Sequence, residues 1–555
     1  MRVQQQDGGY MARGQHTTTD RRQALPLGIV LVIILCTVAY VRIRLLQVPF
    51  ERDEGEYAYM GQLMLKGVAP YANVSTMKLP GVSALYALFM LLFGQTVMGV
   101  HLGFMIVNGV SIALVYLLSE RLLGRESALI SCATYAVMSL SWSVLGVFAH
   151  ATHFVVLFTL AGFVLLFRHL DSGGALPLAT GGLCFGTAFL MKQHALLFLI
   201  CAGAYLLWSY HTQRKGIRAA AAAGGWFLAG ALVPYTVVLL LVLRAGIFPE
   251  FWFWTVQYAR EYVAEMTAAQ GWANFSLNFG TLVKYQLPFM VMAALGGSML
   301  LLARCSDTGR VFIAGFLAVS CLAICPGWYF RPHYFILLLP AVALLAGGCA
   351  HPAAFIHTRP AVQTFRQVVL PLLLAAAFAF VCYKERKYLF LHTPRQVSRG
   401  CYALSPFPES VAIARYIRER TVPADRIAVL GSEPQIFFYA DRLSATRHIY
   451  MYGLMENHPY AMAMQREMIA EVERARPEYI VMVNNEMSWY AQRPVYNGIM
   501  VWGVEYARDY DTAVTADIIS NEETVWRWGD EAGRYPLTGR SSLVVLKRRG
   551  GAGSR

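Results

Sequence analysis

Long apolar stretches recur through the first two thirds of this sequence, and they constrain the fold more than any other feature. A helix of about 20 apolar residues matches the thickness of the hydrocarbon core of a bilayer. The composition agrees, because 57% of the 555 residues are hydrophobic and only 14% are charged. The sequence therefore predicts a polytopic α-helical membrane protein with about eleven transmembrane helices. The expected spans are residues 24–46, 81–118, 127–146, 151–167, 175–191, 194–210, 219–243, 281–303, 311–326, 333–349 and 367–383.

Basic residues in the short loops predict the orientation, because Lys and Arg are retained on the cytoplasmic side. The segment before the first span contains four arginines, and the stretch "HTQRKGIR" falls on the same side of the membrane. We therefore expect a cytoplasmic tail at 1–23, a transmembrane domain at 24–383 and, within it, a first outer loop at 47–80. The net charge of +14 then reflects topology and attraction to anionic lipid, since no basic and aromatic stripe indicates nucleic acid binding.

The composition changes after Tyr383, where the chain becomes mixed and polar. We expect residues 384–555 to form a soluble domain on the outer face. Within it, "RIAVLG" predicts a buried strand at 427–430, and "HPYAMAMQREMIAEVERARPEYIVMV" predicts a helix that Pro477 ends, followed by a strand at 479–483. Strand, helix and strand in this order indicate a small α/β domain.

From Phe50 onward the first outer loop reads "FERDEGEYAYMG", a stretch with four closely spaced carboxylates. A structural interpretation makes Asp53 the cap of a helix, with Glu56 completing a capping box. Tyr57, Met60 and Met64 would then form an apolar stripe lying on the membrane interface. A functional interpretation keeps a carboxylate at the interface for acid–base chemistry.

Cationic and polar residues at other outer span ends favour the functional interpretation. Lys78 lies in "MKLPG", Lys192 in "FLMKQHALL", and Arg331, His333 and Tyr334 in "WYFRPHYFILLLP". A charge at membrane depth costs about 3 kcal/mol unless it is paired or solvated. Each cation alone could be a snorkelling anchor, but together they suit an anionic lipid headgroup beside the carboxylates.

These segments, together with "GSEPQIFFYADRLSATRHIY" near the C-terminus, resemble the bacterial branch of the GT-C membrane glycosyltransferases. That branch is similar to the protein O-mannosyltransferases and to the aminoarabinose transferase of lipid A. The resemblance implies a catalytic acid in the first outer loop and a polyprenyl-phosphate sugar as donor. It also implies a glycolipid, glycan or protein acceptor, with the active site on the outer face of the bacterial inner membrane.

The resemblance also implies roles for individual residues in an inverting transfer. Asp53 would be the general base, and Glu54 would orient Asp53 or a sugar hydroxyl. The donor phosphate would be bound without a metal cofactor by Lys78, Lys192, Arg331, His333 and Tyr334.

One segment departs from the pattern of the family. Where relatives carry a second acidic residue, this chain has "GVFAHATHFVV", with His150 and His153. These histidines are either polar anchors or, like Glu56, supporting contacts to acceptor or phosphate. A divalent ion held by both histidines and Asp53 lacks a further spaced ligand, so no metal cofactor is predicted.

Two other classes of protein stay open as alternatives. A polyprenyl-lipid transporter or flippase would show half-helices broken by Gly or Pro and mid-span charges in two matching halves. This sequence instead gathers its charges at the outer side and shows no duplication. A non-catalytic lipid-binding scaffold of the cell envelope would leave the C-terminal domain as the functional part.

Overall fold

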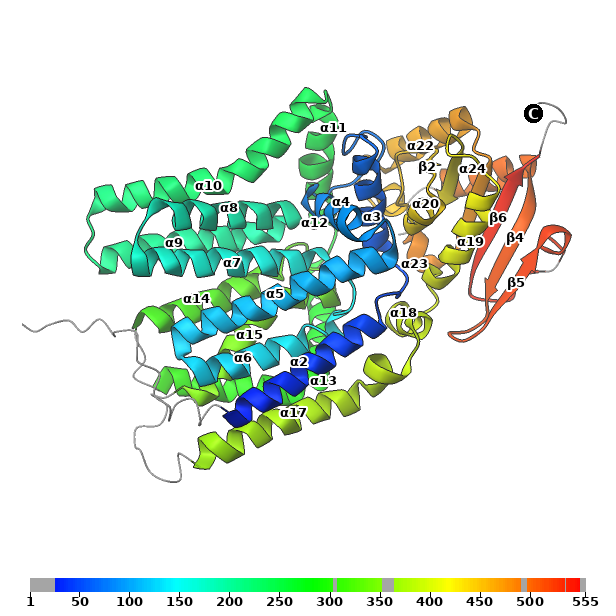
Figure 1. Ribbon diagram of the computed structural model, residues 1–555. Helices are drawn as coiled ribbons and strands as arrows, with labels where there is room; N and C mark the ends of the chain where they lie inside the picture. The colour runs from blue at the N-terminus through cyan, green and yellow to red at the C-terminus, as the bar shows by residue number, and fades with distance from the viewer. Residues whose placement is uncertain (1–24, 303–306, 352–363, 491–496, 535, 550–555) are drawn as a thin grey trace, which may run out of the picture.

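The computed structural model describes residues 25–302, 307–351, 364–490, 497–534 and 536–549. Figure 1 shows a bundle of long helices lying side by side, with a mixed α/β region at one end of the bundle. The predicted cytoplasmic tail at 1–23 lies outside the described residues. The helices along the bundle are α2 (Leu25–Arg44), α5 (Val97–Leu123), α6 (Arg125–Met138), α7 (Ala151–Ser172), α8 (Ala175–Met191), α9 (Leu196–Thr212), α10 (Ile217–Arg244), α13 (Ala268–Leu302), α14 (Asp307–Ala323), α15 (Leu339–Gly347) and α17 (Leu370–Lys384).

These helices confirm a polytopic membrane protein. Within the described ranges, seven helices are long and apolar enough to cross a membrane, and four further apolar helices are shorter. The predicted span at 81–118 is wrong in its extent, because the chain breaks into α4 (Gly81–Phe93) and α5. Gly94 ends α4 with a φ of 92°, and the Thr96 side chain caps α5 by accepting from Gly99 N at 3.0 Å.

Small residues let the bundle helices approach closely. A Cβ atom added at Gly182 of α8 would lie 2.0 Å from the Phe227 carbonyl oxygen of α10. One added at Gly230 of α10 would lie 1.9 Å from the Ala179 carbonyl oxygen of α8. Such close contact replaces the hydrophobic driving force that is missing between helices in lipid.

The C-terminal α/β region runs from α18 (Pro394–Tyr402) to β6 and contains a six-stranded sheet of order β2-β1-β3-β6-β4-β5. The predicted strands are confirmed as β1 (Arg426–Leu430) and β3 (Tyr479–Asn484), which pair in parallel, and the predicted helix as α22 (Ala461–Ala475). The sequence interpretation missed the antiparallel half of the sheet. The remaining elements are α19 (Phe407–Glu419), α20 (Gln435–Ala440), β2 (Leu443–Ser444), α21 (Tyr452–Met455), α23 (Glu486–Trp489), α24 (Gly498–Tyr506), β4 (Tyr510–Ile518), β5 (Thr524–Trp528) and β6 (Ser541–Arg548).

The segment predicted to be the first outer loop folds into α3 (Arg52–Leu65), which lies beside α4 between the bundle and the α/β region (Figure 1). All residues of α3 from Glu54 to Leu63 are buried. A Cβ atom added at Gly55 would lie only 2.6 Å from the backbone nitrogen of Gln435, so α3 packs tightly against α20. The predicted apolar stripe on the membrane interface is therefore wrong, because the α/β region covers this helix.

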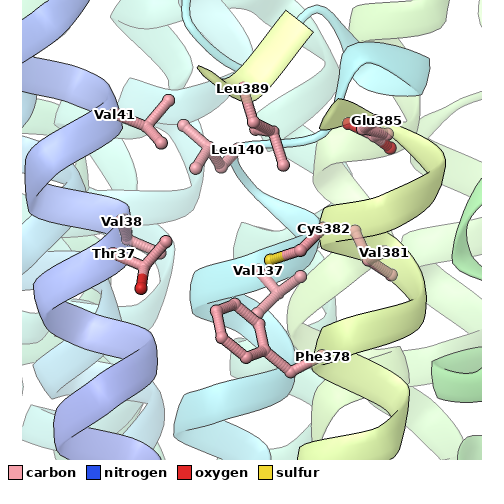
Figure 2. Close-up of a pocket in the computed structure, with 10 residues that line it drawn as sticks. All are labelled: Thr37, Val38, Val41, Val137, Leu140, Phe378, Val381, Cys382, Glu385 and Leu389. Atoms are coloured by element: carbon pink, nitrogen blue, oxygen red, sulfur yellow. The ribbon is translucent and has the colours of Figure 1, made fainter. Parts of the chain in front are cut away.

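Figure 2 shows a small gap that α2, α6 and α17 leave between them. Its volume is about 10 Å³, which is room for no more than one water molecule. Glu385 lies at its edge and accepts hydrogen bonds from Ser141 Oγ at 2.5 Å, Trp142 N at 2.8 Å and Gln286 Nε2 at 2.9 Å. This gap is a feature of helix packing and is too small for a substrate.

Candidate active site

The N-terminus of α3 positions the four closely spaced carboxylates that the sequence places between the first two apolar spans. Glu51 caps the helix, because its Oε1 accepts from Glu54 N at 2.9 Å while Glu54 Oε2 accepts from Glu51 N at 3.4 Å. The predicted capping box of Asp53 and Glu56 is wrong, since the cap lies two residues earlier. Asp53 is therefore free of a capping role and presents its carboxylate in the first helical turn.

Asp53 is paired with a lysine in the structure. Lys78 Nζ lies 2.7 Å from Asp53 Oδ1 and 2.5 Å from Glu56 Oε2, and the Thr76 hydroxyl donates to Glu56. Burial by itself would raise the pKa of Asp53, but the positive charges of Lys78 above all, and of Arg331, hold that pKa well below its ordinary value. The carboxylate of Asp53 is therefore ionised at physiological pH.

Two buried histidines complete the surroundings of Asp53. His150, the N-cap residue of α7, stacks on His333 with ring centroids 4.2 Å apart. Burial lowers the pKa of His150 to about 4 and that of His333 well below its ordinary value, so both rings are neutral. One ligand atom each of Asp53, His150 and His333 lie within 4.8 Å of one another, so these residues could share a divalent ion.

His153 does not belong to this group. Its ring packs against Phe104 at 4.7 Å between centroids, and both of its nitrogens are buried without a hydrogen-bond partner among the described residues. The sequence analysis considered a divalent ion held by Asp53, His150 and His153. In the structure such an ion would instead be held by Asp53, His150 and His333.

The remaining predicted phosphate ligands lie near Asp53. Lys192 Nζ lies 3.6 Å from the ring centroid of Tyr334, and Arg331 Nη2 donates to the Tyr262 hydroxyl at 3.3 Å. Burial, together with the positive charges of Arg331 and Lys78, lowers the pKa of Lys192 to about 7, although Asp53 opposes this shift. Three cations from three separate segments thus surround one ionised carboxylate.

Glu54 lies differently from what the sequence suggested. Its side chain is fully buried, and its Oε1 accepts from Ala149 N at 2.6 Å and lies 3.0 Å from His101 Nε2. These contacts join α3 to the segment before α7. The Glu54 carboxylate therefore holds neighbouring segments together. Because it is buried and already hydrogen-bonded, this arrangement argues against a contact with a sugar hydroxyl.

A cleft of about 760 Å³ opens between the start of α13 and the end of β3. Near it, the rings of Tyr452 and Tyr490 pack at a tilt of 44° with their centroids 5.3 Å apart, and the Tyr452 hydroxyl donates to the Met487 carbonyl oxygen at 2.7 Å. Sequence reasoning missed this cleft, because its walls come from segments more than 200 residues apart. Its lining includes Glu265, Gln270, Asn484, Glu486, Met487 and Tyr490.

The geometry defines a class of protein: a polytopic membrane protein whose charged, buried site lies where a helical bundle meets an α/β region. Residues 77–234, which include Lys78, His150 and Lys192, match the family model of the dolichyl-phosphate-mannose-protein mannosyltransferases. A sequence search among curated proteins found no match.

Solved structures of membrane glycosyltransferases share the fold. ArnT from Cupriavidus metallidurans bound to undecaprenyl phosphate is 13% identical, with a TM-score of 0.58 over 97% of this chain and 100% of that one. The same enzyme in the apo state is 14% identical, with a TM-score of 0.56 over 94% and 98% of the two chains. AglB, the oligosaccharyltransferase from Archaeoglobus fulgidus in complex with an inhibitory peptide and a dolichol-phosphate, is 13% identical, with a TM-score of 0.52 over 94% and 76%. The family model thus matches residues 77–234, and the solved structures show that the chain shares the fold of these proteins.

Proposed function

We propose that this protein is an inverting glycosyltransferase that moves a sugar from a polyprenyl-phosphate donor to an envelope acceptor at the outer face of the membrane. The observation that carries the proposal is the ionised Asp53, 2.7 Å from Lys78 and surrounded by Lys192, Arg331 and two neutral histidines. The structures bound to undecaprenyl phosphate and to dolichol-phosphate support a lipid-phosphate donor for this fold.

The chemistry follows from these charges. The acceptor hydroxyl attacks the anomeric carbon, its proton passes to Asp53, and the bond to the phosphate oxygen breaks. The leaving group is a polyprenyl phosphate monoester, whose new negative charge Lys78, Lys192 and Arg331 stabilise. Because Asp53 loses its charge as it takes the proton, Glu56 is then the one carboxylate that still pairs with Lys78 as the charge on the leaving phosphate develops. One displacement of this kind inverts the anomeric configuration.

The acceptor enters, in this proposal, through the cleft beside Tyr490. The Tyr452 hydroxyl contacts both Met487 of the cleft and Arg52, the residue before Asp53. This path brings the acceptor from the aqueous side of the α/β region, while the donor reaches the site from the bilayer. The residues that line the cleft offer carboxylate, amide and phenol groups that can bind a polar acceptor.

The active site faces the outside of a bacterial inner membrane in this proposal. The loop between α9 and α10 contains Arg214 and Lys215, and Arg218 follows in the first turn of α10. This loop lies at the end of the bundle opposite the α/β region (Figure 1). Reporter fusions at Thr76 and after Gly400 should both give an exported signal. A cytoplasmic signal from either position would contradict this orientation.

Donor binding should depend on the charge of Lys192. Its lowered pKa of about 7 means that the ammonium charge is present at lower pH and is lost as the pH rises through 7. The phosphodiester donor keeps one negative charge throughout, so we expect donor affinity to fall by up to about tenfold between about pH 6 and about pH 8. Lys192→Arg should flatten this profile, because arginine stays charged. Equal profiles for the two proteins would contradict a phosphate contact by Lys192.

Purified protein given a panel of radiolabelled polyprenyl-phosphate sugars tests the proposed reaction. We expect one donor to release polyprenyl phosphate and to label an envelope acceptor. A flippase would move the donor between the leaflets of a liposome with its sugar–phosphate bond intact, and a scaffold would bind it unchanged. Absence of bond cleavage with every donor in the panel would contradict the transferase.

A further inference from the structure

The carboxyl ends of strands β1 and β3 in the α/β region carry a small group of polar residues that faces the helix containing Asp53. In open α/β sheets, ligands bind outside the carboxyl ends of the parallel strands. In this protein Ser432 and Glu433 follow β1, and Ser488 lies in α23 just after β3. Ser488 Oγ donates to Glu433 Oε2 at 2.6 Å, and Ser432 N donates to Ser488 Oγ at 2.7 Å. The carboxylate of Glu433 is thereby fixed and fully buried.

The guanidinium of Arg52 occupies this strand-end site. Its Nη2 lies 3.0 Å from Glu433 Oε1, and its Nε donates to the Ser432 carbonyl oxygen at 2.6 Å. Its Nη1 donates to the Tyr452 hydroxyl at 2.7 Å. All three guanidinium nitrogens therefore bind groups of the α/β region, and the Arg52 side chain is only 11% exposed.

Arg52 directly precedes Asp53, so whatever fixes Arg52 also fixes the start of α3. Tyr450, also from the α/β region, donates to the Arg52 carbonyl oxygen at 2.9 Å and lies 3.5 Å from Asp53 Oδ1. Arg52 is thus held both through its side chain and through its carbonyl oxygen, which belongs to the peptide bond to Asp53. This arrangement leaves Asp53 little freedom to move away from Lys78.

We propose that Glu433 is a positioning residue, which acts through Arg52 to hold Asp53 at its place in the active site. The proposal rests on the proposed transferase function, and it makes the α/β region a part of the catalytic apparatus. Removing one partner of a buried ion pair leaves the other charge uncompensated, so Arg52 would leave this site. A displacement of about 1 Å at a catalytic group can reduce turnover by roughly a hundredfold.

The test compares Glu433→Gln with Glu409→Gln in the full-length protein. Glu409 is a matched control, because it forms a buried ion pair with Arg399 at 2.6 Å in the same α/β region. We expect Glu433→Gln to reduce kcat by roughly 10- to 100-fold with donor affinity unchanged. Glu409→Gln should lower Tm while kcat stays within about twofold of wild type. In a double-mutant cycle, Arg52→Gln should add little to the loss caused by Glu433→Gln.

Hydrogen exchange gives a second readout that does not depend on activity. Amides at the start of α3 should exchange faster in Glu433→Gln than in wild type, whereas Glu409→Gln should leave them unchanged. Wild-type kcat in Glu433→Gln, equal losses of kcat in both variants, or unchanged exchange in α3 would each overturn the positioning role. Absence of transfer by the wild-type protein would instead contradict the proposed function, and the exchange comparison would still decide the positioning role.

Discussion

Asp53→Asn should reduce sugar transfer by about a hundredfold or more, because asparagine keeps the shape of aspartate but cannot accept a proton. Glu51 rather than Asp53 caps α3, so this substitution removes no helix cap. Melting temperature should therefore stay near that of the wild type. Donor affinity should be equal or higher, since Lys78 loses a competing carboxylate. Single-turnover transfer with saturating donor measures the effect.

Asp441→Asn is a suitable control for this substitution. Asp441 accepts from Lys66 Nζ near the C-terminal end of α3, and both side chains are partly exposed. Its removal should change transfer by less than about twofold, since exposed ion pairs contribute little. Near-normal turnover of Asp53→Asn would exclude Asp53 as the base. Glu56, the other carboxylate bound to Lys78, would then be tested before Glu54, whose contacts are to Ala149 and His101.

Lys78→Ala should weaken donor binding by roughly 10- to 100-fold, because a charge-assisted contact in a poorly hydrated site contributes about 1.5–3 kcal/mol. The substitution also leaves Asp53 and Glu56 without their shared cation, so kcat should fall as well. Titration of a labelled polyprenyl-phosphate sugar against purified protein separates the two effects.

Lys66→Ala provides the matched control for Lys78→Ala. Lys66 lies at the C-terminal end of α3, but its ion pair with Asp441 is exposed, with side chains 41% and 35% accessible. Donor affinity of Lys66→Ala should therefore equal that of the wild type. Unchanged affinity in Lys78→Ala, or the same weakening in both variants, would make Lys78 an anchor rather than a phosphate ligand.

The bundle could be predicted from sequence because the bilayer imposes a length and an apolar composition on each span. The expected span at 219–243, for example, corresponds to α10. Strands β1 and β3 were predictable for a similar reason, since central strands buried on both faces form continuous apolar runs. Strand β4 gives no such run, because Asp511, Thr512, Thr515 and Asp517 interrupt its apolar residues. The run "LVVL" in β6 was a usable signal that the sequence interpretation passed over.

The site could be predicted only where a charge was out of place for its depth in the membrane. Asp53, Lys78, Lys192 and Arg331 drew attention in this way, and the structure brings them near one another. The ion pair of Arg52 and Glu433 joins residues 381 positions apart, and neither position has a local pattern that reveals the other. The cap at Glu51 was missed because several adjacent carboxylates could each have served.

The anomeric configuration of the transferred sugar tests the central claim most directly. Purified protein would transfer a sugar from its polyprenyl-phosphate donor, and NMR of the product would give the configuration before any hydrolysis. A single displacement with Asp53 as base predicts that the configuration is inverted in the product. Retention of the donor configuration would require a covalent glycosyl intermediate or a second displacement, and it would contradict the role of Asp53.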